Sequence, residues 1–216
     1  MSIEHHPDDS MLAAFAAGTL DHGQHIAIAT HLVSCPQCRA FMHAMEHVGG
    51  AVLSRLSPAP MSSNALKQAE ARLNETPLLA AIPAAATVSG TEVSALPEFV
   101  RRYRFGRWTW IAPSVHIRPI LLTQTSDTRV FLLKSGPGTK MLQHSHTGIE
   151  MTCVLTGAFS HDGGHYGPGD FDLGDETVDH QPVVDAGLEC ICLVAMQGEL
   201  CLNGLIGRLM QPFVRL

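Results

Sequence analysis

The sequence predicts an α + β protein of two domains, a small helical bundle followed by a β-sandwich or small barrel. Apolar residues recur at helical spacing up to about Pro77 and with a period of two after Pro97. The stretch between them, PLLAAIPAAATVSGTEVSALP, is rich in alanine and interrupted by proline and glycine, which is typical of a linker. The 216 residues suffice for two small cores. We therefore expect domains over residues 1–85 and 97–216, joined by a linker over 86–96.

The N-terminal part reads as about four helices. Their segments are DDSMLAAFAAG (8–18), HGQHIAIATHLVS (22–34), PQCRAFMHAMEHVGGAVLSRL (36–56) and SSNALKQAEARLNE (62–75). An aspartate precedes the first and a glycine ends it, as helix caps require. The second segment places Ile26, Ala29 and Val33 on one face, and the fourth has Leu66, Ala69 and Leu73 as an apolar stripe.

The C-terminal part alternates between short apolar runs and glycine-rich turns. The runs SVHIRPI (114–120), TRVFLLK (128–134), IEMTCVLTG (149–157) and LECICLVAM (188–196) have strand-like composition. Turn signals such as SGPG, DGG and GPGD separate many of them. Many short strands with such turns indicate a sandwich or a small barrel.

Composition and charge restrict the function classes. A formal net charge of −6 argues against a nucleic-acid-binding groove. Residues 1–85 contain four basic and seven acidic side chains, which suits a basic protein partner. No segment is apolar and long enough to span a bilayer, and the start MSIEHHPDDS lacks the features of a signal peptide. We expect a cytoplasmic protein whose six cysteines are thiols or metal ligands, and no membrane contact.

The stretch HLVSCPQC places His31, Cys35 and Cys38 at the spacing of zinc ligands. Pro36 disfavours a helical residue before it, so one helix is expected to end at Cys35 and the next to begin at Pro36. A structural Zn²⁺ would then brace a helix–helix corner and needs a fourth ligand. The residues leave His5 and His6 as alternatives for it. A redox CxxC pair and two simple core cysteines are the competing interpretations of this stretch.

A second cluster of donors lies in GTKMLQHSHTGIEMTCVLTG. His144 and His146 are two apart and so share a face of a strand, and Glu150 has the same parity. Two imidazoles and a carboxylate that converge inside a barrel form a divalent-metal site, for which His180 supplies a later ligand. We interpret His161, together with His116 and His165, as a surface or turn residue.

The cysteines of LECICLVAM offer a further possibility. Cys190 and Cys192 alternate on one strand face, so exposed thiols there would suit direct oxidation sensing. Free cysteines are commonly buried, however, and we interpret this pair as small core residues.

At these positions the chain resembles known families. Residues 138–157 match the first cupin motif, and YGPGDFDLGDETVDHQP resembles the second, with His180 in it. HHPDDSMLAAFAAGTL followed by HLVSCPQC resembles the zinc-binding anti-sigma domain, a likeness that favours His6 as the fourth ligand. The two together resemble the ChrR family of cytoplasmic anti-sigma factors.

The ChrR resemblance implies a function. The helical domain of such proteins binds an extracytoplasmic-function sigma factor as a heterodimer and keeps it from RNA polymerase, without binding nucleic acid directly. Their cupin domain is needed for the response to singlet oxygen, a form of oxidative stress, and both sites hold zinc. We accordingly expect a structural Zn²⁺ in the helical domain, and Zn²⁺ or another divalent metal in the cupin.

The alternative is an enzyme. Cupins with three histidines and a glutamate also act as metal-dependent dioxygenases or isomerases, which need an open coordination position and a substrate pocket. A purely catalytic cupin has no need of a metal-clamped helical domain, so we expect a transcriptional regulator.

Overall fold

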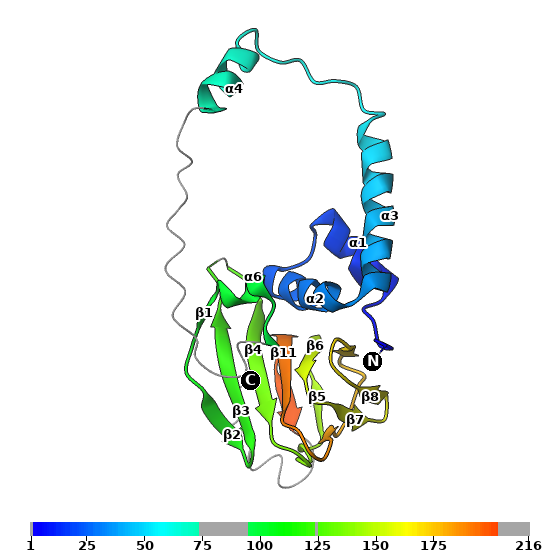
Figure 1. Cartoon of the computed structure of the whole chain (residues 1–216), viewed down its shortest axis with the longest axis vertical. Coiled ribbons are helices and arrows are strands. Elements are labelled where there is room, and N and C mark those ends of the chain that lie inside the picture. The colour runs from blue at the N-terminus through cyan, green and yellow to red at the C-terminus, as the bar shows by residue number, and fades with distance from the viewer. Residues whose placement is uncertain (1, 74–94, 124, 203–216) are drawn as a thin grey trace.

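The computed structural model describes residues 2–73, 95–123 and 125–202. The expected domain boundary at residue 85 and most of the linker over 86–96 lie outside this part of the chain. The described residues begin with helices and continue with antiparallel sheets (Figure 1). None of the described helices is long and apolar enough to cross a membrane.

The four expected N-terminal helices are present, with ends that differ from prediction by a few residues. They are α1 (Asp9–Ala17), α2 (His22–Ser34), α3 (Pro36–Leu53) and α4 (Ala65–Leu73), and a short α6 (Glu98–Arg101) leads into the sheets. The carboxylate of Asp8 accepts a hydrogen bond from the backbone N–H of Met11 at 2.8 Å and so caps α1. Gly18 ends that helix at φ 68°, a left-handed conformation that favours glycine.

The strands form one large and two small antiparallel sheets within the described residues. The large sheet has the order β1-β3-β4-β11-β6-β9, with β2 paired to β3; the small sheets are β10-β7-β8 and β12-β5. The strands are β1 (Arg104–Phe105), β2 (Thr109–Ala112), β3 (Val115–Leu121), β4 (Thr128–Ser135), β5 (His144–His146), β6 (Glu150–Thr156), β7 (Phe159–His161), β8 (Gly164–Tyr166), β9 (Phe171–Gly174), β10 (Val183–Val184), β11 (Cys190–Gln197) and β12 (Leu200–Leu202). The four predicted strands correspond to β3, β4, β6 and β11.

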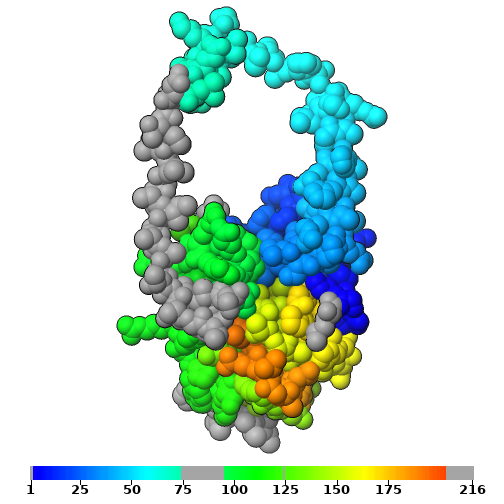
Figure 2. Space-filling model, viewed as in Figure 1, coloured from blue at the N-terminus to red at the C-terminus, as the bar shows by residue number. Residues whose placement is uncertain are grey.

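Helix α2 lies directly on the large sheet, where it contacts β11, β6 and β4 (Figure 1). One hydrophobic cluster therefore contains residues of both regions, including Ile28 of α2 and Leu193 of β11, each 0% exposed. Figure 2 shows the blue N-terminal residues packed against the yellow part of the sheets. Of the apolar face expected on α2, Ile26 is buried but Val33 is 57% exposed, because the sheet covers a different side of the helix at that end.

Helix α3 leaves the body after its first turns, and α4 lies apart from the rest (Figure 1). Cys38 and Met42 of α3 are buried, whereas Val48 and Val52 are each 57% exposed. The predicted apolar stripe of α4 exists but is not buried, since Leu66 and Leu73 are strongly exposed. These two helices thus present apolar side chains that the described chain does not cover.

Candidate metal centres

The helix–helix corner expected at Pro36 is present, and it brings four predicted donors together. Cys35 ends α2 and caps α3, and its sulfur accepts the backbone N–H of Cys38 at 3.4 Å. His31 lies on the last turn of α2 and faces the same point. His6 reaches the corner from the segment before α1. The donor atoms of these four residues all lie within 4.8 Å of one another.

The distances among these donors fit a tetrahedral ion. His6 Nδ1 lies 3.4 Å from the sulfurs of both Cys35 and Cys38, and His31 Nε2 lies 3.3 Å from Cys38 Sγ. Zn–N and Zn–S bonds at tetrahedral angles place a nitrogen and a sulfur about 3.5 Å apart. The side chain of His5 instead stacks on Tyr166, with ring centroids 4.2 Å apart. The geometry thus brings His6, rather than His5, to the cluster.

The surroundings of the four donors suit metal ligation. Burial lowers the pKa of His31 to about 4, so its imidazole is neutral at pH 7 and keeps a lone pair for a metal. Its Nδ1–H donates to the carbonyl of Gly169 at 2.8 Å, which directs Nε2 toward the sulfurs. Burial and the neighbouring Cys35 raise the pKa of Cys38 to about 12. A divalent cation would displace that thiol proton and compensate the buried thiolate.

The second predicted cluster gathers at one end of the β-sheets. His144 and His146 lie on β5, and His180 joins them through reciprocal backbone hydrogen bonds with His144 of 3.0 and 3.1 Å. His180 Nε2 lies 3.0 Å from His144 Nε2 and 3.4 Å from His146 Nε2. Such spacings are those of imidazoles that share one ion, since two Zn–N bonds at a tetrahedral angle span about 3.3 Å.

Desolvation keeps these three imidazoles neutral. Burial lowers the pKa of His146 and of His180 to about 4, and it also lowers that of His144. His144 donates from Nδ1 to the carbonyl of Leu142 at 2.8 Å, which leaves its Nε2 for the cluster. A neutral histidine triad of this kind is a ligand set for Zn²⁺ and for other divalent transition metals.

Glu150 lies beside this triad but does not converge with it. Its Oε2 is 3.6 Å from Nδ1 of His146, on the ring nitrogen that does not face His180. Burial, with the nearby Asp172, raises the pKa of Glu150 to about 7. The structure therefore brings three of the four predicted donors together and places the fourth against the outer side of one of them.

Sequence reasoning missed a pair next to the triad. The expectation that His161 is a surface residue is wrong, because its side chain is 6% exposed and its Nε2 lies 3.0 Å from the Asp172 carboxylate. The His161 ring also packs against His180, with centroids 4.9 Å apart. The only hint in the sequence was parity, since His161 lies two residues after the buried Phe159 on β7. His165 is exposed, as expected.

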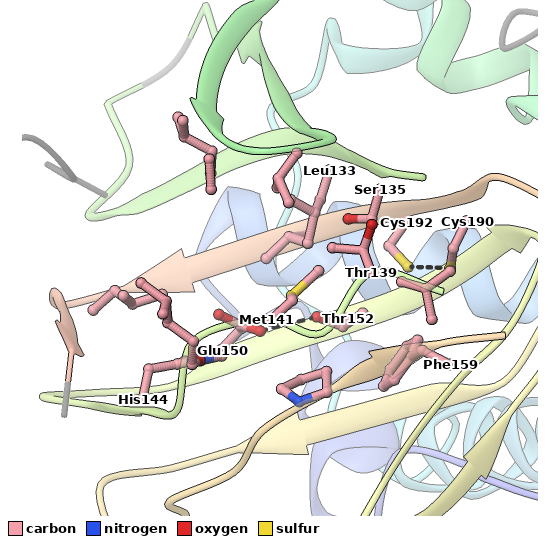
Figure 3. Close-up of a pocket in the computed structure, with 18 of the residues that line it drawn as sticks. Leu133, Ser135, Thr139, Met141, His144, Glu150, Thr152, Phe159, Cys190 and Cys192 are labelled. Carbon is pink, nitrogen blue, oxygen red and sulfur yellow. Dashed lines mark hydrogen bonds between the residues drawn. The ribbon is translucent and has the colours of Figure 1, made fainter. Parts of the chain in front are cut away.

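A cavity of about 560 Å³ opens beside this second cluster (Figure 3). The polar side chains of Glu150 and Thr152 and that of His144 lie on one part of its wall, and apolar side chains form most of the remainder. Those apolar residues include Trp110, Phe131, Leu133, Phe159, Val194, Met196, Leu200 and Leu202. The thiols of Cys190 and Cys192 also line it, with 3.7 Å between their buried sulfurs.

Comparison with known proteins identifies the family. A family model described as the ChrR cupin-like domain matches residues 98–198. The anti-sigma-E factor ChrR of Cereibacter sphaeroides is 35% identical over 218 residues, and the match covers the whole of both chains. This chain belongs to the ChrR family.

A solved structure of a ChrR protein agrees with this assignment. ChrR in the crystal structure of Rhodobacter sphaeroides SigE in complex with the anti-sigma ChrR matches with a TM-score of 0.74 and 30% identity. The match covers 91% of this chain and 100% of that one. An RmlC-like cupin protein from Ralstonia eutropha JMP134 is more distant, with a TM-score of 0.40 and 20% identity over 46% of this chain and 68% of its own. The predicted fold class, N-terminal helices before a cupin-like β region, is confirmed.

Proposed function

We propose that this ChrR-family chain is a cytoplasmic anti-sigma factor that binds an extracytoplasmic-function sigma factor as a heterodimer and keeps it from RNA polymerase. The observation that carries this proposal is the full-length similarity to an anti-sigma-E factor, together with the fold shared with ChrR in its complex with SigE. In this proposal residues 1–85 capture the sigma factor, and residues 97–216 regulate that capture. The role is regulatory and not catalytic.

The uncovered apolar side chains of α3 and α4 support a partner at this place. Within the described chain these residues pack against little, and they continue for several helical turns beyond the body (Figure 1). Together with Leu56 and Met61 of the segment between the two helices, we call them the α3–α4 surface: Val48, Val52, Leu53, Leu56, Met61, Leu66 and Leu73, each at least 57% exposed. Apolar side chains that stay exposed along two successive helices suit contact with another protein.

We propose that His6, His31, Cys35 and Cys38 hold a structural Zn²⁺ that braces the start of α3. Two nitrogens and two thiolates form a closed ligand set that Zn²⁺ favours and that leaves no position for substrate. A structural zinc of this type contributes roughly 10–16 kcal/mol of apparent binding free energy, which is large compared with the stability of a small helical domain. The ion would thus fix the direction in which α3 leaves the body.

The β region is proposed to be the sensor. His144, His146 and His180, with Glu150 beside them, would hold Zn²⁺ or another divalent metal, and oxidative stress such as singlet oxygen at this region would release the sigma factor. The cavity beside the triad favours one second candidate, a metal-dependent dioxygenase or isomerase, because that chemistry needs such a space next to its metal.

Co-purification tests the proposed function. The chain is co-expressed with the extracytoplasmic-function sigma factors of its own host, and each complex is isolated by size exclusion and assayed for inhibition of transcription. A stoichiometric complex that blocks transcription is expected. Failure to bind any of these factors would refute the proposal, and oxygen uptake with a turned-over substrate would favour the enzyme.

A pair of matched variants locates the partner surface. Val52→Asp introduces a charge into the α3–α4 surface and is expected to weaken sigma binding at least tenfold, since interfacial apolar residues are desolvated on binding. Leu188→Asp is the control, because Leu188 is 72% exposed but lies in the β region before β11. Equal binding by the two variants would place the sigma factor elsewhere.

A further inference from the structure

The β region reaches into the N-terminal donor cluster. The His31 Nδ1–H donates a buried hydrogen bond of 2.8 Å to the carbonyl of Gly169, a residue 138 positions away in the sequence. Gly169 belongs to the turn that precedes β9. The ring of one of the four clustered side chains is therefore held by the backbone of the β region as well as by its own helix α2.

A second hydrogen-bond set from the same turn holds the segment that carries His6. The Oδ1 atom of Asp170 accepts the backbone N–H of Glu4 at 2.7 Å and that of His5 at 3.0 Å. The backbone N–H of Phe171 donates to the carbonyl of His5 at 3.1 Å. Residues 2–7, which we call the arm, are thus fixed immediately before His6.

Packing on both sides of the arm reinforces these bonds. The backbone of Gly169 has a φ of +93°, which favours glycine, and a Cβ there would stand 2.7 Å from Cδ1 of Ile3, so Ile3 lies directly on this turn. The His5 ring stacks on Tyr166 of β8. The arm therefore lies against the β region through Ile3 and His5, and His6 is left to face the sulfurs.

The same turn continues into the wall of the second cluster. Asp172, two residues after Asp170, carries the carboxylate that pairs with His161, and it lines the cavity. His161 in turn packs on His180. Residues 169–172 thus touch the N-terminal donors at one end and the surroundings of the histidine triad at the other.

We propose that Gly169 and Asp170 are positioning residues for the N-terminal zinc centre: they hold His31 and the arm, so that the β region sets the rate at which zinc leaves. This inference rests on the proposed zinc centre. In metalloproteins, partners that orient the ligating side chains change metal affinity about 10- to 100-fold when they are removed. Displacement of residues 169–172 would then loosen the ion without any change in its ligands.

Thiol alkylation of the full-length, zinc-loaded chain measures the rate at which zinc leaves Cys35 and Cys38. A chelator and iodoacetamide are added together, and the modification of Cys35 and Cys38 is followed by peptide mass spectrometry. Asp170→Ala removes the acceptor of both arm N–H groups, and we expect about tenfold faster alkylation. Asp170→Asn keeps one acceptor oxygen, and its rate should be intermediate. Alkylation of Cys201, which lies on β12 of the β region, should not change.

Two further variants keep the test decisive. Ile3→Ser weakens the arm without any change in the β region, and it should also speed the alkylation of Cys35 and Cys38. Asp185→Ala is the control, since this carboxylate pairs with the exposed His165 and not with a residue of the arm. If Asp170→Ala does not fold, Ile3→Ser alone decides.

The outcomes separate this inference from the function on which it rests. Wild-type chain whose Cys35 and Cys38 are alkylated at once, before any chelator is added, has no zinc centre there, and that part of the proposed function fails. Wild-type chain that is protected, with Asp170→Ala and Ile3→Ser protected equally well, overturns the positioning role alone.

Discussion

Substitution of Gly23 by alanine tests how closely α2 lies on the large sheet. Gly23 is the second residue of α2, and a Cβ placed on it would stand 2.7 Å from Cβ, 2.8 Å from Cγ2 and 2.9 Å from the carbonyl oxygen of Thr128. Rotation of the Thr128 side chain relieves neither the contact with its Cβ nor that with its backbone oxygen. Helix α2 must therefore move away from the start of β4 by about half an ångström.

The expected cost follows from two opposing effects. Overpacking of a well-packed contact destabilises a protein by about 1–3 kcal/mol. Alanine is favoured over glycine in a helix by about 0.5–1 kcal/mol, which offsets part of this cost. We expect Gly23→Ala to lower the free energy of unfolding by about 1–2 kcal/mol, or the melting temperature by about 2–8 °C for a chain of this size.

Urea unfolding of the zinc-loaded chain, followed by circular dichroism, measures this difference. Gly49→Ala is the matched control, because Gly49 is also helical and nothing lies within 4 Å of the added methyl group. That variant should gain the helix propensity alone and become more stable. If Gly23→Ala is as stable as Gly49→Ala, the close packing of α2 against β4 is refuted.

Three more outcomes are expected. Replacement of Cys35 and Cys38 by serine should remove one zinc per chain in metal analysis and abolish sigma binding. If the variant still binds the sigma factor, the zinc ion is not needed for that binding. Asp172→Asn weakens the acceptor for His161, and we expect metal affinity at the triad to fall about tenfold in a chelator competition; an unchanged affinity would exclude this role. Burial tends to raise the pKa of Asp21, but hydrogen bonds, led by those from Ser126 and Thr128, hold it below its ordinary value. A lowered pKa contributes stability that is complete above the unfolded value and is lost as the pH falls through the folded one. Asp21→Asn should thus cost stability at pH 7 and little at pH 2, and an equal cost at both would contradict this reasoning.

Local signals in the sequence predicted the elements well. Pro36 after Cys35 marks the corner between α2 and α3, and alternation of apolar residues locates the long strands, because both features depend only on neighbours in the chain. The spacing of the metal-ligand candidates within each motif is likewise a local feature of the sequence. His144 and His146 share a strand face by parity, and the structure brings them together with His180.

Features that depend on distant parts of the chain could not be predicted in this way. Periodicity shows that a helix face is apolar but not what covers it, so it could not predict that Val33 and Leu66 are exposed. The pairing of His161 with Asp172 depends on how β7 and β9 approach each other. Asp170 anchors the arm through Glu4 and His5, which lie 166 and 165 positions away in the sequence. No local pattern predicts so distant a contact.

That sequence separation also has a consequence for biosynthesis. A ribosome adds about 5–20 residues per second, so the arm is made roughly 10–30 s before Asp170 exists to hold it. His31, Cys35 and Cys38 leave the exit tunnel in the meantime, with an imidazole at position 6 that nothing yet restrains. We expect a nascent chain to exchange its first zinc ion readily and to retain it firmly only when translation has passed β9.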